Sequence, residues 1–83
     1  MGYHDSLNSL KNDVANGFVT AKVENGELVI EGDTYRHKNF LKGEYRGTGI
    51  HWDKDRKAWA VSVDSLYRGD KERTEEFFGI EIA

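Results

Sequence analysis

The sequence predicts a small α+β domain in which two β-hairpins build one antiparallel sheet and helices pack against it. Two segments alternate apolar and polar residues with period two around a turn signal, residues 18–32 and residues 50–63. Segments with helical spacing of apolar residues precede, separate and follow them. The chain has 83 residues, the length of one domain, so residues 1–83 are expected to share a single core.

The first predicted helix begins near Asp5 or Ser6, either of which can cap it, and stops at Gly17. Its apolar residues follow helical spacing: Leu7, Leu10 and Val14. The first hairpin then turns at Asn25-Gly26, because both positions of a two-residue turn need positive φ. This turn places four apolar residues on one face, Val23 opposite Leu28 and Ala21 opposite Ile30. The charged residues take the other face: Lys22, Glu24, Glu27 and Glu31.

A second helix is expected after a cap at Asp33 or Thr34, ending around Gly43 or Gly47. Its inner face follows helical spacing: His37, Phe40, Leu41 and either Glu44 or Tyr45. The second hairpin begins at Ile50, and a turn centred on residues 54–57 makes Trp52 face Trp59. One side of it then carries Ile50, Trp52, Trp59, Val61 and Val63, which favours both tryptophans as core residues over base-stacking residues.

The C-terminal third predicts a short turn capped by Asp64, an interruption at Gly69, and an acidic helix from Asp70 to Phe78. Residues 79–82 alternate like a short strand, which would be a fifth strand of the sheet. The predicted order is therefore α-ββ-α-ββ-α, with an optional final β.

The sequence lacks the residues and motifs that several classes of function require. There are no cysteines, which excludes disulfides, thiolate nucleophiles and Cys-ligated zinc and favours a reducing compartment. The histidines at 4, 37 and 51 match no zinc-binding spacing, and neither a Gly-x-Ser-x-Gly motif nor a phosphate-binding glycine loop occurs. No segment has the apolar length of a signal peptide or a membrane span. We therefore expect a cytoplasmic protein that is not an enzyme and uses no metal or cofactor.

Charge is distributed unevenly along the chain. Residues 34–59 hold seven Lys/Arg and three Asp/Glu, a net charge of +4, while the remaining residues hold five and twelve, a net charge of −7. The seven cations are the candidate nucleic-acid-binding residues, because Lys and Arg bind phosphates: Arg36, Lys38, Lys42, Arg46, Lys54, Arg56 and Lys57. A charged helix and turn of this size is equally typical of a solvated surface, and the sequence leaves both interpretations open.

Residues 34–63 also carry a recurring pattern. It is an aromatic-x-x-Lys-x-x-Leu-Lys segment followed by Gly-x-x-Trp-Asp and Lys-x-Trp, formed by Tyr35, Lys38, Leu41, Lys42, Gly49, Trp52, Asp53, Lys57 and Trp59. This pattern resembles the helix-plus-hairpin element of HARP-type domains in annealing helicases and of small modules in phage and plasmid replication enzymes. The resemblance implies contact with single-stranded or junction DNA.

Three functions fit these observations. The first is a nucleic-acid-binding module that uses the basic residues of the 34–59 segment. The second is a protein-binding or inhibitor module of phage or mobile-element origin, whose acidic C-terminal helix, with Glu72, Glu75 and Glu76, meets a basic protein partner. The third is a structural or homodimerising domain.

Overall fold

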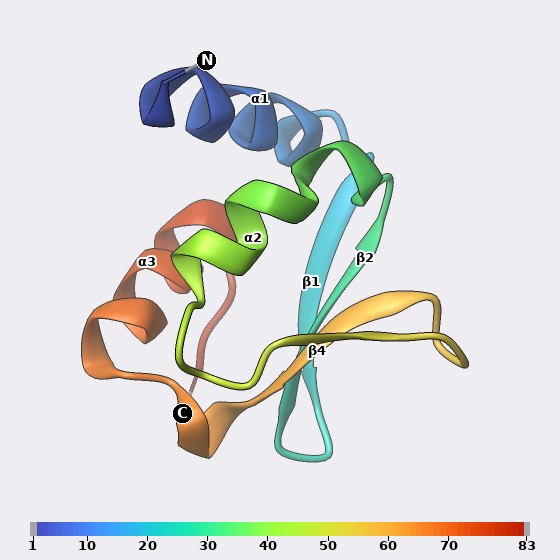
Figure 1. Cartoon of the computed structure of the whole chain (residues 1–83), viewed down its shortest axis with the longest axis vertical. Helices are drawn as coiled ribbons and strands as arrows, with labels where there is room; N and C mark the ends of the chain where they lie inside the picture. The colour runs from blue at the N-terminus through green and yellow to red at the C-terminus, as the bar shows by residue number, and fades with distance from the viewer. Residues whose placement is uncertain (1, 83) are drawn as a thin grey trace.

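The structure, a computed structural model that describes residues 2–82, has the predicted order of helices and hairpins (Figure 1). Two single turns of 3-10 helix, η1 and η2, accompany the main elements. The elements are α1 (Tyr3–Ala15), β1 (Val19–Glu24), β2 (Glu27–Gly32), η1 (Tyr35–His37), α2 (Lys38–Glu44), β3 (His51–Asp53), β4 (Ala58–Ser62), η2 (Val63–Ser65) and α3 (Arg68–Phe78).

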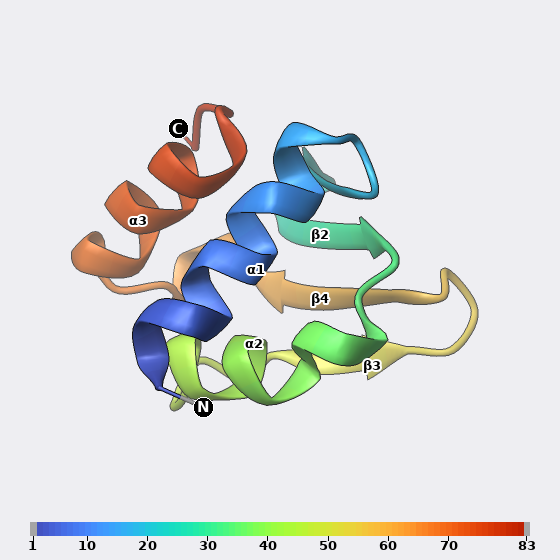
Figure 2. The ribbon, with the colours of Figure 1, turned by 90° about the horizontal axis from the view of Figure 1, so that it is seen from above.

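The two hairpins form one antiparallel sheet with the strand order β1-β2-β4-β3. Strands β2 and β4 are adjacent, with Leu28 opposite Val61 and Ile30 opposite Trp59. Figure 2 shows α1 and α2 crossing over the sheet on one side, with α3 beside them. The helices bury the apolar face, so the core lies between the two layers: Leu10, Val19, Leu28, Ile30, Leu41, Tyr45, Trp59, Val61, Val63, Leu66 and Ile82.

The first hairpin confirms the predicted turn and register. Asn25 and Gly26 have φ of +52° and +77°, the left-handed conformation of a two-residue hairpin turn. Val23 faces Leu28 and Ala21 faces Ile30, as expected. Local turn chemistry and period-two patterning therefore specify this hairpin together.

Replacing Gly26 by valine should lower the free energy of unfolding by about 1 kcal/mol or more, because a β-branched residue is strained at positive φ. Gly26→Asn is the matched control, since asparagine tolerates the left-handed region. Chemical denaturation of both variants measures the difference. Equal midpoints for the valine variant and the wild type would contradict the turn.

The ends of the helices differ from the predictions in three places. The first helix begins at Tyr3, before Asp5, and the Tyr3 ring packs against Phe40 with the ring centroids 5.6 Å apart. Helix α2 is preceded by a turn of 3-10 helix, and neither Asp33 nor Thr34 caps it with a side chain. The C-terminal helix begins at Arg68.

Gly69 therefore lies inside α3 rather than interrupting the chain before it. The Asp70 carboxylate accepts a hydrogen bond from the backbone N–H of Tyr67 at 3.1 Å, which satisfies an amide at the start of the helix. Residues 79–82 form no strand. Instead, the backbone N–H of Ile82 donates to the Glu75 carboxylate at 2.8 Å, and the Ile82 side chain is buried in the core.

A buried hydrogen bond joins α1 to the segment that precedes α2. His37 Nε2 lies 2.5 Å from Asp13 Oδ2, and both side chains are buried. Hydrogen bonding to His37, with help from Arg36, lowers the pKa of the Asp13 carboxyl below its ordinary value. Because a buried unpaired charge is costly, this pair fixes the position of η1 relative to α1. The histidine expected on the helix's apolar edge is thus a structural residue.

Candidate nucleic-acid interface

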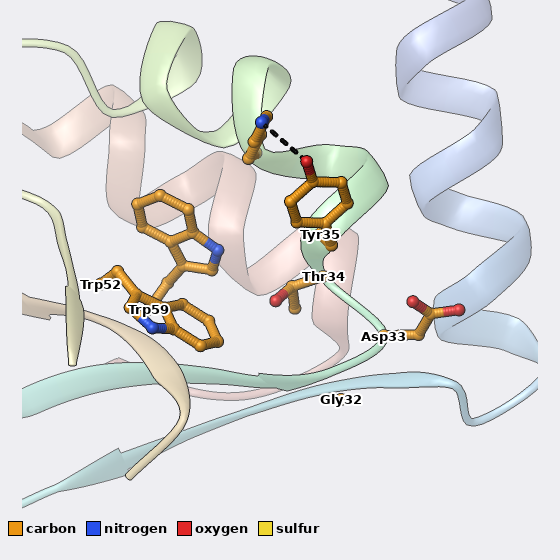
Figure 3. A pocket seen from close by; sticks show the side chains of 7 residues that line it. Gly32, Asp33, Thr34, Tyr35, Trp52 and Trp59 are labelled. Carbon is orange, nitrogen blue, oxygen red and sulfur yellow. Dashed lines mark hydrogen bonds between the residues drawn. The ribbon is translucent and has the colours of Figure 1, made fainter. Parts of the chain in front are cut away.

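A pocket of about 420 Å³ opens between the loop that follows β2 and the β3–β4 hairpin. Three aromatic side chains surround it, as Figure 3 shows: the two indoles lie on one side and the Tyr35 ring on the other. We call it the aromatic pocket, and its lining is Gly32, Asp33, Thr34, Tyr35, Lys38, Trp52 and Trp59.

The two tryptophans face each other across the hairpin, as predicted, but only one is a core residue. Trp59 is 6% exposed, whereas Trp52 is 44% exposed. Strand β3 is a three-residue edge strand, so no further strand covers Trp52 on its outer side. Their ring centroids are 5.7 Å apart with an edge-to-face geometry. The prediction of a buried Trp52 is therefore wrong. The exposed Trp52 ring packs against the buried Trp59 ring.

Tyr35 is the most exposed of the large aromatic residues at 76%. It stands at the first position of η1, directly after the loop that leaves β2. An aromatic ring held this far into solvent contributes little to the core and leaves most of its surface free for contact. Sequence reasoning did not include Tyr35 among the site residues, although it opens the aromatic-x-x-Lys pattern.

Two of the predicted cations stand beside these rings. Lys38 Nζ lies 3.3 Å from Tyr35 Oη and 4.4 Å from the centroid of that ring. Lys42, one helical turn later, places its ammonium 5.9 Å from the centroid of the Trp59 ring. Both contacts are within the range of cation–π attraction. Lys38 also lines the aromatic pocket, and Lys42 lies against one of the rings that line it.

The seven predicted cations divide into two groups. In the part of the chain that the structure describes, residues 2–82, five of them make no ion pair: Lys38, Lys42, Arg46, Lys54 and Lys57. Lys54 and Lys57 lie in the exposed turn between β3 and β4, and Arg46 lines a separate hollow beside Tyr3 and Phe40. These five side chains remain available to phosphates.

The two arginines of the other group are engaged within the protein. Arg36 contacts Asp13 at 3.0 Å and Asp33 at 3.8 Å. Arg56 contacts Asp53 at 2.7 Å and Glu27 at 2.9 Å. Hydrogen bonding to Arg56 lowers the pKa of the Asp53 carboxyl, as expected for a paired carboxylate.

The Arg56 side chain also lies on the face of the sheet opposite to the aromatic pocket. Glu27 is next in sequence to Leu28, which faces the core, so by alternation Glu27 projects from the opposite face. The side chain of Arg56 extends to this face, away from the helices and from Tyr35.

The acidic helix offers less free charge than its sequence suggests. Asp70 is buried and paired with Arg73 at 2.6 Å, and Glu75 accepts the backbone N–H of Ile82. Glu72 pairs with Arg68 at 3.4 Å on the surface. Three carboxylates of α3 therefore have partners within the domain: Asp70, Glu72 and Glu75.

No cluster of three or more potential metal-ligating residues occurs among residues 2–82, and no helix in that range is both long and apolar enough to cross a bilayer. Comparison of the chain with protein-family models, with curated proteins and with solved structures finds no match.

Proposed function

We propose that the protein binds single-stranded or junction nucleic acid at the aromatic pocket, with Tyr35 and Trp52 meeting bases and the neighbouring lysines meeting phosphates. The observation that carries the proposal is the convergence of two exposed aromatic rings and Lys38 on one pocket. Stacking platforms beside cations are the usual means by which proteins hold unpaired strands.

Each part of this arrangement supplies a recognised share of binding. Stacking of one base on an aromatic side chain contributes about 1 to 3 kcal/mol and tolerates any sequence. Lys38 lines the pocket, Lys42 lies against the Trp59 ring, and Lys54 and Lys57 lie in the turn of the hairpin that carries both tryptophans. Each stacked base is followed by a backbone phosphate, so cations near the stacking rings can bind that phosphate. In the sequence, Lys38 and Lys42 follow Tyr35, and Lys54 and Lys57 lie between Trp52 and Trp59.

The acidic remainder of the chain limits the affinity. The net charge of the whole protein is −3, so long-range attraction of a polyanion is weak and binding depends on contacts at the pocket. A strand with unpaired bases should therefore be preferred to a duplex, whose bases cannot reach the rings. The resemblance of residues 34–63 to the HARP-type element points to the same ligands. We place this activity in the cytoplasm, where a chain without cysteine is unaffected by the reducing environment.

The proposal predicts that a labelled single-stranded oligonucleotide binds at low salt and dissociates as salt rises, which fluorescence anisotropy measures. The double variant Lys38→Glu/Lys42→Glu should bind at least about tenfold more weakly, because both cations beside the aromatic rings become anions. Its stability should change little, since Lys42 is exposed, Lys38 is only half-buried, and neither forms an ion pair among residues 2–82.

The matched control is Lys11→Glu/Lys71→Glu, which makes the same change in net charge on α1 and α3. This control should bind nearly as well as the wild type. Equal losses in the two double variants would show a general charge effect instead of a site. Absence of binding by the wild type at low salt would refute the proposal.

A further inference from the structure

We propose that the aromatic pocket takes in one unpaired base and that the indole N–H of Trp59 donates a hydrogen bond to an acceptor atom of that base. This inference rests on the proposed function and goes further, because it distinguishes insertion of a base from stacking on the outer surface.

Trp59 Nε1 is the first support. The atom is buried, and within residues 2–82 it has no hydrogen-bond partner. A buried donor without a partner is rare in native proteins, because the donor has lost its water and gained nothing in return. Trp59 lines the aromatic pocket, and because Nε1 itself is covered, a base in the pocket reaches this donor once the neighbouring side chains shift aside.

The shape of the pocket is the second support. A volume of about 420 Å³ lies in the range of small-ligand sites and accommodates a flat heterocycle with its sugar. Figure 3 shows the indoles and the Tyr35 ring on opposite sides of the space, so an inserted base meets an aromatic group on either side. Every nucleobase has acceptor atoms on its edge, and the pocket should therefore discriminate little between bases.

The charges at the rim favour a neutral base with an anionic phosphate over a cationic ligand. Aromatic cages also bind quaternary ammonium groups, but here the Lys38 ammonium already lies 4.4 Å from the Tyr35 ring centroid. The Asp33 carboxylate, which could attract a cation, points away from the tryptophans in Figure 3 and pairs with Arg36. A phosphate attached to the inserted base meets Lys38 instead.

A strand made of abasic nucleotides with a single central thymine tests the insertion. Its backbone charge is the same as that of a wholly abasic strand, and only one position can enter the pocket. The wholly abasic strand should bind about tenfold or more weakly, in accordance with the loss of one stacked base.

The hydrogen bond is tested with a thymine isostere, difluorotoluene, at the same position. The isostere keeps the shape and the stacking surface but is a poor acceptor, so it should bind roughly twofold to tenfold more weakly than thymine. In Trp59→Phe, which lacks the N–H, thymine and the isostere should bind equally. If that variant does not fold, the comparison of the two strands with the wild-type protein decides the matter.

The outcomes separate the two proposals. Equal binding of the thymine strand and the abasic strand, with the loss in Lys38→Glu/Lys42→Glu retained, would overturn insertion and leave nucleic-acid binding intact. Equal binding of thymine and the isostere by the wild type would overturn the role of Trp59 Nε1. If an ordinary oligonucleotide also fails to bind, the proposed function itself is wrong.

Discussion

Trp59→Ala should lower the free energy of unfolding by about 3 to 5 kcal/mol, the usual cost of truncating a large buried aromatic residue. Trp59 is the second residue of β4, opposite Ile30 on β2, and belongs to the core between the sheet and the helices. Removing its indole leaves a cavity beneath α2, next to the aromatic pocket. Urea denaturation followed by circular dichroism measures the loss, which is a large fraction of the whole stability of a domain of this size.

The matched control is Trp52→Ala, which removes the same side chain from the neighbouring edge strand. Because Trp52 is 44% exposed, this variant should lose much less stability and should remain folded. It should nevertheless lose binding to single-stranded oligonucleotides, since it removes a stacking surface. Similar destabilisation by both substitutions would contradict the division into one core tryptophan and one pocket tryptophan.

The sequence could not make this division, although it predicted the pairing of the two tryptophans. Pairing depends on the turn and on the alternation of residues along each strand, and both are local properties. Burial depends on which strands are adjacent in the sheet. The order β1-β2-β4-β3 leaves β3 at an edge, and only the packing of the two hairpins against each other decides that.

The distinction between local pattern and tertiary packing also explains why the sequence could not separate the paired cations from the unpaired ones. All seven are visible in the sequence as one basic segment, but Arg36 and Arg56 each have one acidic partner that is distant along the chain. Asp13 is 23 residues from Arg36, and Glu27 is 29 residues from Arg56. Composition alone cannot show that these two arginines are engaged while Lys38 and Lys42 stand beside aromatic rings.

Helix boundaries were predictable where a backbone signal was strong. Gly17 ends α1 with the predicted left-handed conformation, and the backbone N–H of Phe18 bonds to the Asp13 carbonyl at 2.8 Å. Gly69 misled the prediction, because a glycine near the start of a helix costs only about 1 kcal/mol and is offset here by Asp70. The predicted C-terminal strand at residues 79–82 does not form, because this segment pairs with neither edge of the sheet. Its alternating residues, Ile80 and Ile82, pack on the core instead.

Gly32 combines a positive φ with a close backbone contact, which the sequence did not predict. Gly32→Ala should therefore destabilise the protein by at least about 3 kcal/mol. Its φ is +102°, and an added Cβ would lie 2.1 Å from the carbonyl oxygen of Phe18. That carbonyl accepts the backbone N–H of Asp33 at 2.8 Å, a bond that turns the chain from β2 toward η1. The alanine variant must therefore shift backbone atoms as well as adopt an unfavourable φ.

Gly49→Ala separates the two contributions. Gly49 has a φ of +84°, but an added Cβ there meets nothing within 4 Å, so only the backbone strain of about 1 to 3 kcal/mol applies. Denaturation midpoints should therefore fall in the order wild type, Gly49→Ala, Gly32→Ala. Equal losses would show that the close approach of Phe18 is not maintained in solution. Because Gly32 and Tyr35 line the same pocket, a Gly32→Ala protein that still folds should also bind single strands more weakly, through displacement of Tyr35.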